Sequence, residues 1–313
     1  MGSYIIRRLL SILPVMGIVA VIIFLLLHLA PGDPAAVMAG DNVTQEAIAQ
    51  MRERLGLDEP LWRQFLLWVL HLLHGDLGNS MFWGDPVTTL IAQRAEPTIS
   101  LALTSGAFAV AIALLIGIAA AANAGTALDR FVMGFAVLNL SVPAFVVGYL
   151  LIFVFAIELK WLPVQGYSPI ADGVGPWLRS LILPAVVLGL PYVAFIARIT
   201  RATMLEVLGE DYLRTARAKG VASGPLLMKH ALKNAAPPIV TVIGMGVGFL
   251  IGGAVVTETV FNFPGIGRLV VDAIARRDYP IIQGVTLVFS GVYMLINLLV
   301  DLSYPLFDPR VRY

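Results

Sequence analysis

The stretch PTISLALTSGAFAVAIALLIGIAAAANAG, residues 97–125, contains no Asp, Glu, Lys or Arg over 29 positions. A helix that crosses the roughly 30 Å of hydrocarbon in a bilayer needs about 20 predominantly apolar residues, so this stretch is long enough to span a membrane. A strand of a membrane barrel has about 10 residues of alternating polarity, and residues 97–125 do not alternate. The stretch therefore predicts a transmembrane helix.

Five further stretches of at least 18 residues also lack charge, and the six together are 9–30, 97–125, 131–157, 180–197, 236–257 and 279–300. The 313 residues are 58% hydrophobic and 13% charged, with a mean hydropathy of +0.86, whereas about 25% of the residues in a soluble domain are charged. We therefore predict an all-α polytopic membrane protein with six transmembrane helices. The fourth stretch is the weakest because it is short and contains Pro184 and Pro191, although membrane helices tolerate proline.

The first uncharged stretch follows Arg7 and Arg8 and resembles the start of a signal peptide. Its 22 residues exceed the length of a signal-peptide apolar region, and no A-x-A cleavage site follows. We expect an uncleaved first span. The chain has no cysteine, which excludes disulfides and thiolate metal sites.

The loop charges predict the side of the membrane that each loop faces. If the N-terminus is cytoplasmic, six spans place the C-terminus there too, and the inner segments then hold 12 basic and six acidic residues. The longer outer segments hold nine basic and 14 acidic residues. Because Lys and Arg are enriched in cytoplasmic loops, we expect both termini to be cytoplasmic.

Three regions follow along the chain: 1–30 with the first span, an extracytoplasmic segment at 31–96, and a core of five spans at 97–313. In the second region, Pro31 to Pro34 predicts a turn that ends the first helix. Residues 60–75, PLWRQFLLWVLHLLHG, are apolar but too short to span, so we expect them along the membrane surface. In the core, one short helix is expected after Pro264 and Gly265 near the outer surface.

The fifth span contains Gly244, Gly248 and Gly252 at intervals of four. Small residues at this spacing let helix backbones approach closely in lipid, so we expect helix packing there. Lining of a substrate path is the alternative.

The longest predicted cytoplasmic segment is the loop at 198–236. It contains DYLRTARAKG, residues 211–220, in which four of ten side chains are charged. Residues 203–219 contain no proline and one glycine, which predicts a helix, and Gly220 is placed to end it. Pro225 then predicts the start of a second short helix, and Pro237-Pro238 the entry to the fifth span.

Periodicity alone leaves several interpretations of this loop open. Its small residues would let another protein approach, and its charges would fix the register of that contact. An amphipathic helix on anionic lipid has the same pattern. The basic residues also serve as a topology signal.

Several motifs resemble one family in the expected order. EDYLRTARAKG at 210–220 with KHALKNAAPP at 229–238 resembles the shared cytoplasmic loop of ATP-binding-cassette (ABC) importer permeases of the dipeptide, oligopeptide and nickel family. ARA-x-G at 216–220 stands where the core of that loop lies, although the literal E-A-A triplet is missing. The other matching motifs are LAPGDP at 29–34, LGLDEPLWRQF at 55–65, GDLGNS at 75–80, FNFPGIGRLVVDAI at 261–274, RDYPIIQG at 277–284 and DPRVR at 308–312.

The resemblance covers nearly the whole chain and is to the first permease subunit of dipeptide-type systems. It implies the fold of a type I importer permease, in a bacterial inner membrane. It also implies a second homologous permease subunit, two cytoplasmic ATPases that hold ATP and Mg, and an extracytoplasmic binding protein. The helix at 203–220 is then expected to dock on the ATPase, with coupling residues Glu210, Asp211, Tyr212, Arg214, Ala216, Arg217, Ala218 and Gly220.

Other functions are less compatible with the residues. None of the four lysines follows a glycine, so the chain has no P-loop of the G-K-[ST] type and we expect no bound cofactor, no catalysis and no nucleic-acid partner. The uncharged spans argue against an ion-coupled secondary transporter, whose proton relays usually lie within the membrane. His71 and His74 form the closest histidine pair, without an evident third metal ligand.

The cargo is not specified by these patterns. Dipeptides or oligopeptides are the main expectation, with a nickel or metal-chelate importer, or a glutathione importer, as the alternatives. Candidates for lining the path or its outer gate are Asn139, Ser141, Glu258 and Asn262.

Overall fold

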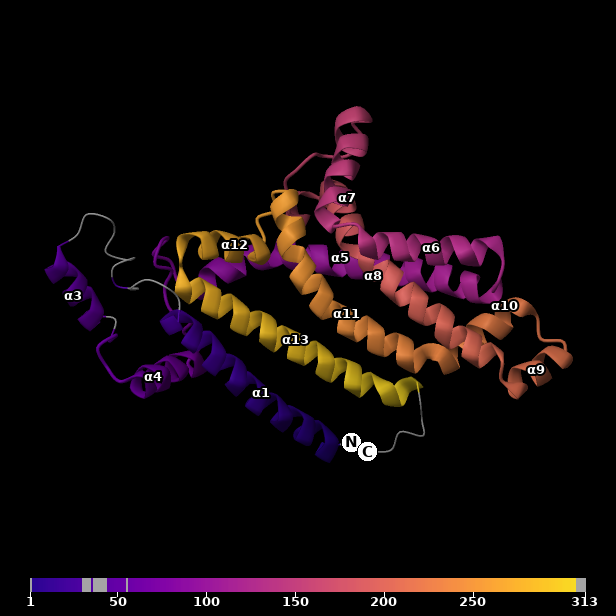
Figure 1. The fold of residues 1–313 in the computed structure, drawn as a ribbon, viewed down its shortest axis with the longest axis horizontal. Helices are drawn as coiled ribbons and strands as arrows, with labels where there is room; N and C mark the ends of the chain where they lie inside the picture. Colours follow the sequence, from indigo (N-terminus) through magenta and orange to yellow (C-terminus); the bar gives the residue numbers. More distant parts are fainter. Residues whose placement is uncertain (1, 30–34, 36–43, 55, 308–313) are drawn as a thin grey trace.

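The computed structural model describes residues 2–29, 35, 44–54 and 56–307, and apart from one isolated bridge between Asn79 and Pro86 the secondary structure of this part is helical (Figure 1). The predicted turn at Pro31 to Pro34 and the DPRVR motif at 308–312 lie outside the described residues. The helices before the core are α1 (Gly2–Leu29), α3 (Gln45–Arg54) and α4 (Leu61–Leu73). The core contains α5 (Val87–Ala122), α6 (Ala127–Ser141), α7 (Ala144–Leu151), η1 (Ile152–Glu158), η2 (Ile170–Asp172), α8 (Val174–Leu208), α9 (Asp211–Ala218), α10 (Ser223–Pro225), η3 (Leu226–Ala231), α11 (Leu232–Val260), α12 (Ile266–Arg276) and α13 (Tyr279–Phe307).

Four helical segments are long and apolar enough to cross a membrane: Val87–Ala122, Val174–Leu208, Ser223–Val260 and Tyr279–Leu302. They coincide with the second, fourth, fifth and sixth predicted spans. Pro184 and Pro191 lie inside α8 without ending it. The first predicted span corresponds to α1, whose apolar part Leu10–Leu26 is at the lower end of the length that a crossing needs.

The third predicted span is not one straight helix. α6 and the α7–η1 segment meet at an angle of 104°, and Figure 1 shows α7 standing away from the direction of α6. The break lies at Val142, which is extended with φ −93° and ψ 127° and precedes Pro143. A residue before proline is driven out of the helical conformation, so the uncharged stretch 131–157 is not the unbroken helix that its lack of charge predicts. Counted as one span, the bent pair brings the number to five.

The core is centred on α5 and α8, which pack at close range. A Cβ on Gly117 of α5 would lie 2.8 Å from Thr200 Cβ of α8, and one on Gly189 of α8 would lie 2.8 Å from Phe108 of α5. Since real Cβ atoms do not approach so closely, both glycines are required for this packing. The buried cluster also includes residues of η1, α9, η3 and α11, so the short loop helices are part of the same core.

α11 is held by glycine contacts on two sides. A Cβ on Gly244 or Gly248 would meet Val300 or Tyr293 of α13 at 2.3 and 2.7 Å. On the other side, a Cβ on Gly246 would lie 1.8 Å from Tyr192 of α8, whose hydroxyl donates a hydrogen bond to the Ile243 carbonyl. The predicted helix packing is therefore confirmed at Gly244 and Gly248.

At Gly252 the predicted close packing is absent, because no atom lies within 4 Å of the position that its Cβ would take.

Two motifs that are 198 residues apart in sequence meet beside α12. The Asp278 side chain, 1% exposed, accepts a hydrogen bond of 2.5 Å from Ser80 Oγ and two more from the backbone N–H groups of Met81 and Phe82. A buried carboxylate needs such partners because leaving it unpaired is costly. GDLGNS and RDYPIIQG therefore form one joint between the segment before α5 and the α12–α13 turn.

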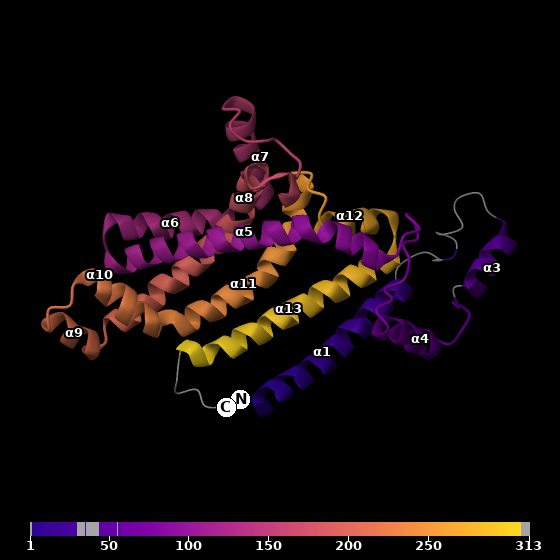
Figure 2. The same cartoon turned by 180° about the vertical axis from the view of Figure 1, so that it is seen from behind.

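The apolar helix predicted at 60–75 is present as α4 and packs on the end of α1. The ring centroids of Phe65 and Trp68 lie 5.3 and 5.7 Å from that of Phe24, and His28 Nε2 donates to Gln64 Oε1 at 3.1 Å. α4 also exposes Leu61, Leu66, Leu67, Leu70 and Leu73. Figures 1 and 2 show α4 and α12 at one end of the molecule and α9 and α10 at the other.

Candidate coupling site

The predicted loop helix at 203–219 is divided in two by the structure. α8 continues to Leu208, and Gly209 and Glu210 then separate it from α9, with Glu210 extended at ψ 143°. Glycine is a poor helix former, and the single glycine of this segment marks the break. Glu210 therefore precedes α9, and its carbonyl accepts the N–H groups of Leu213 and Arg214.

The second short helix predicted after Pro225 is also not separate. α10, η3 and α11 form one helical segment, Ser223–Val260, and α11 runs through Pro237 and Pro238. Membrane helices tolerate proline where neighbouring groups satisfy the freed carbonyls. Pro237 and Pro238 stand where the fifth uncharged stretch begins, but they do not begin a new helix.

Gly220 ends α9 as predicted. Its φ of +85° is left-handed, a conformation that glycine adopts without strain. Its N–H bonds to the Arg217 carbonyl at 3.0 Å, and the Val221 N–H bonds to the Ala216 carbonyl at 3.2 Å. These two bonds form a Schellman motif, with Ala216 and Val221 packed on the core.

α9 displays most of the predicted coupling residues on its surface. Asp211, Arg214, Arg217 and Ala218 are exposed, with Lys219 beside them. Arg214 Nη1 lies 3.4 Å from Asp211 Oδ1, and both side chains are largely exposed, so this pair contributes little to stability. Among the described residues Arg217 forms no ion pair, and its guanidinium remains accessible to a partner.

The opposite side of α9 is held by Tyr212, a predicted coupling residue, and by Leu213 and Asn234, which the sequence patterns did not single out. Leu213 is the buried residue of α9, 1% exposed, in the same core cluster as Leu226 and Ala231 of η3. Tyr212 is half-exposed, and its hydroxyl accepts a hydrogen bond of 2.7 Å from Asn234 Nδ2 in the first turn of α11. Leu213 is the one large apolar side chain besides Tyr212 in DYLRTARA, which is the signal that could have identified it.

An ion pair fixes α8 just before it reaches α9. Arg201 of α8 donates from Nε to Asp129 Oδ1 at 2.5 Å and from Nη2 to Oδ2 at 2.7 Å, and the Gly125 N–H donates to Oδ2 at 2.9 Å. The Asp129 side chain is 5% exposed. Two-point pairing of this kind fixes geometry as well as charge. It joins the end of α8 to the α5–α6 turn.

The four candidate path residues lie at two different places. Asn139 and Ser141 are at the end of α6, next to the bend, and Ser141 donates to its own helix at the Val137 carbonyl. Asn262 follows α11 with a left-handed φ of +53° and accepts a hydrogen bond from Arg268. The structure does not place these residues in one described cavity.

Glu258 is fully buried at the end of α11. Its carboxylate accepts hydrogen bonds from Thr98 Oγ1 at 2.6 Å and from the Arg268 N–H at 2.9 Å, while Thr98 Oγ1 accepts the Ile266 N–H at 2.8 Å. Glu258 and Thr98 therefore satisfy the N–H groups at the start of α12 that lack helical partners. In this conformation Glu258 presents no surface to a path.

The glycines of the FPGIG segment make room for this carboxylate. A Cβ on Gly265 would lie 2.2 Å from Glu258 Cδ, and one on Gly267 would lie 2.8 Å from Val255 Cα. Backbone and carboxylate can approach only because both positions lack a side chain. The motif is thus explained by the joint between α5, α11 and α12.

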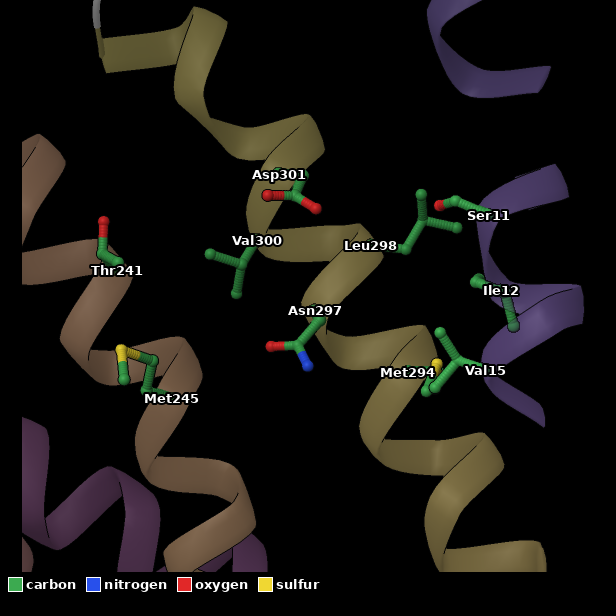
Figure 3. Close-up of a pocket in the computed structure, with 10 residues that line it drawn as sticks. All are labelled: Ser11, Ile12, Val15, Thr241, Met245, Met294, Asn297, Leu298, Val300 and Asp301. Atoms are coloured by element: carbon green, nitrogen blue, oxygen red, sulfur yellow. The ribbon is translucent and has the colours of Figure 1, made fainter. Parts of the chain in front are cut away.

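The pockets found in the described part of the chain lie away from α9. One cavity of about 360 Å³ lies between α1, α11 and α13, where Thr241, Asn297 and Asp301 add polar atoms to an apolar lining (Figure 3).

The histidine pair lies near the end of α4. His71 is 3.6 Å from Asp76, and His74 bonds to the Leu70 carbonyl. Within the part of the chain that the structure describes, no three His, Asp or Glu side chains lie close enough together to hold a metal ion.

Comparison with known proteins gives concordant matches over the whole chain. Residues 113–313 match the family described as binding-protein-dependent transport system inner membrane component. Residues 1–102 match the N-terminal part of such membrane components.

Full-length relatives and a solved structure add to these matches. The chain is 57% identical over 313 residues, the whole of both proteins, to the probable peptide ABC transporter permease protein y4tP of Sinorhizobium fredii. It is 46% identical, again over both whole chains, to the glutathione transport system permease protein GsiC of Escherichia coli strain K12. The inward-facing methionine ABC transporter MetNI has a similar fold, with a TM-score of 0.59, 19% identity and coverage of 71% of this chain and 97% of that one.

Proposed function

This chain belongs to the family of binding-protein-dependent transport system inner membrane components, and from that premise we propose that it forms half of the path by which short peptides enter a bacterial cell. It is a permease component of an ABC importer and a multi-pass protein of the inner membrane. Support for peptides as the cargo comes from the 57% identity to a probable peptide permease along the full length of both chains.

Glutathione is the second candidate cargo. The observation that favours it is the 46% identity to a glutathione permease, also along the full length of both chains. Glutathione is itself a short peptide, so the two candidates share backbone amides and terminal carboxylates.

The proposed arrangement has six spans with both termini in the cytoplasm. The excess of Lys and Arg in the short inner segments supports this orientation. The bent pair of α6 and α7–η1 is the third span in this arrangement, and α1 is the first. The segment at 31–96 is then extracytoplasmic and the loop at 198–236 is cytoplasmic.

The proposed partners divide the work. Two ATPase subunits bind ATP and Mg in the cytoplasm, a binding protein delivers the peptide from outside, and a second homologous permease completes the path as a heterodimer. This chain supplies no catalytic group. Its α9, with the coupling residues from Glu210 to Gly220, docks on one ATPase.

One observation supports this coupling role above the others: α9 is a short charged helix that is exposed on one face and fixed to the core on the other. Leu213 and the Schellman motif at Gly220 hold it in place, so its position is defined before a partner binds. A preorganised helix loses less conformational freedom on docking. A helix that rested on lipid would not need such fixation.

The test of the docking role is charge reversal at Arg217. We expect Arg217→Glu to weaken co-purification of the ATPase and to abolish peptide uptake, with normal amounts of chain in the membrane. The matched control is Lys160→Glu, which reverses an exposed charge in the proposed outer loop. Normal ATPase binding and uptake by Arg217→Glu would contradict the proposal.

Two further measurements address the cargo and the energy source. The binding protein encoded with this chain should bind short peptides in calorimetry more tightly than glutathione or a nickel chelate, and the reverse order would reassign the cargo. Vesicles that contain this chain alone should show no uptake with ATP. Uptake driven by a pH gradient in such vesicles would contradict an ATP-driven importer.

A further inference from the structure

α9 is connected unequally to the two helices that flank it. Toward α8 the connection is Gly209 and the extended Glu210, where the helix is interrupted. Toward α11 the contact is direct, because α9 packs on η3, and η3 continues into α11 without a break. A displacement of α9 therefore has a packed route into α11 and an interrupted route into α8.

The route into α11 has two specific contacts. Leu213 inserts into the cluster that includes Leu226 and Ala231 of η3, and the Asn234 amide donates to the Tyr212 hydroxyl at 2.7 Å. Tyr212 therefore faces α11 with its polar end. The same amide also donates to the His230 carbonyl at 3.0 Å, which fixes its orientation.

The local helix geometry at this contact is unusual. η3 is a π-helix, and π-helical turns are rare and often mark functional sites. A π-turn contains one more residue than an α-turn, so it widens the helix in the element that packs on α9. The element on which α9 packs is thus the π-helical turn of the segment Ser223–Val260.

Whereas η3 and α11 contact α9, the end of α8 is fixed to α5 and α6. Its end is fixed to the α5–α6 turn by the two-point pair of Arg201 with Asp129, and Thr200 is pressed against Gly117 of α5. α5, α6 and the end of α8 therefore form one block. α11 ends at the opposite side of the core, where Glu258 bonds to α12 and to Thr98 of α5.

We propose that α9 acts on the membrane helices through α11, and that Tyr212 and Asn234 are positioning residues for this step. The proposal rests on the proposed docking of α9 on an ATPase. Movement of α9 is passed to η3 by Leu213 and to the first turn of α11 by the hydrogen bond. α11 then carries it to the Glu258 joint with α12 and with Thr98 of α5.

The experiment uses the whole importer in proteoliposomes, with the chain, its partner permease, the ATPases and the binding protein. Two quantities are measured, the affinity of the chain for the ATPase and the number of ATP molecules hydrolysed per peptide imported. Tyr212→Phe removes only the hydroxyl, and Asn234→Ala removes its donor. We expect each variant to raise the ATP used per peptide about two- to tenfold, the effect of one neutral hydrogen bond, with unchanged ATPase affinity.

The double variant should behave like either single variant, because both remove the same bond. Asn234→Asp should retain coupling when Tyr212 is present, since the hydroxyl can donate to the carboxylate, and should not rescue Tyr212→Phe. Tyr149→Phe is the matched control, because Tyr149 lies exposed on α7 and its hydroxyl has no hydrogen bond within the described chain.

Three results would overturn the proposal. Additive effects of the two variants would mean that Tyr212 and Asn234 act separately. A loss of ATPase affinity in Tyr212→Phe but not in Asn234→Ala would place Tyr212 on the ATPase itself and leave the docking role intact. Unchanged coupling in both variants would exclude the route, while failure of the unaltered chain to bind the ATPase would remove the docking role as well.

Discussion

Removal of the Leu213 side chain is the sharpest perturbation of α9. Leu213 is 1% exposed and is the buried side chain of an eight-residue helix. Helices shorter than about 12 residues are marginal in water on their own, so the order of α9 depends on this contact and on its caps. Leu213→Ala should therefore release α9 without unfolding the long helices.

The size of the effect follows from the burial. Replacing a fully buried leucine by alanine costs about 2–5 kcal/mol. A cost of about 3 kcal/mol lowers the ratio of docked to released α9 by roughly 150-fold, since each 1.4 kcal/mol is a factor of ten. The apparent affinity for an ATPase that binds only docked α9 falls by up to the same factor.

Limited proteolysis measures this release directly. Arg214, Arg217 and Lys219 are exposed trypsin sites on or beside α9, and cleavage requires local opening of the helix. We expect Leu213→Ala to be cut up to roughly 100-fold faster, in proportion to the open population. Leu128→Ala is the matched control, because Leu128 is 46% exposed at the start of α6.

An unchanged cleavage rate in Leu213→Ala would refute this reasoning. It would mean that α9 is held by contacts other than Leu213, and the packed route into η3 would lose its main support. Faster cleavage in Leu128→Ala to the same extent would show that the assay reports general loosening of the membrane helices.

Three further predictions concern the packing of the core. Gly246→Ala places a Cβ 1.8 Å from Tyr192 Cε2 and should cost about 3 kcal/mol or more, seen as a lower Tm in detergent; Gly252→Ala, with open space around it, should leave the Tm unchanged. Glu258→Gln turns a donor toward the N–H groups of α12 and should cost about 1–3 kcal/mol; amide exchange in α12 should accelerate, and unchanged exchange would exclude the cap. Asp129→Asn removes the negative charge that pairs with Arg201 in a mostly buried site and should lower the free energy of unfolding by about 2 kcal/mol or more. An unaltered Tm would show that other groups satisfy Arg201.

The sequence was sufficient for the long helices because their signal is the absence of charge over about 20 residues. The same signal carries no information on bends, and so the 104° turn before Pro143 was missed. Gly209 marked the break before α9, but one glycine inside a helical pattern is often tolerated. The Pro237-Pro238 pair does not interrupt the helix, because a packed membrane bundle tolerates proline.

Long-range pairs were beyond the sequence patterns. In the sequence, Asp129 and Arg201 contribute only to the charge balance of the loops, and Asn234 is only a part of the KHALKNAAPP motif. Neither pattern indicates the partner of these residues. Glu258 was a path candidate because a carboxylate near a span end is conspicuous. Its contacts with Thr98 and with the start of α12 come from segments about 160 and 10 residues away, and only the fold brings them together.

The central claim is that an ATPase subunit contacts α9, and cysteine cross-linking tests it most directly. The chain has no cysteine, so a single Ala218→Cys carries the only thiol of this subunit, at an exposed and small position of α9. We predict a cross-linked product with the ATPase in intact membranes, whose yield changes with bound nucleotide. Absence of this product, or an equal yield from Lys160→Cys in the proposed outer loop, would contradict the account.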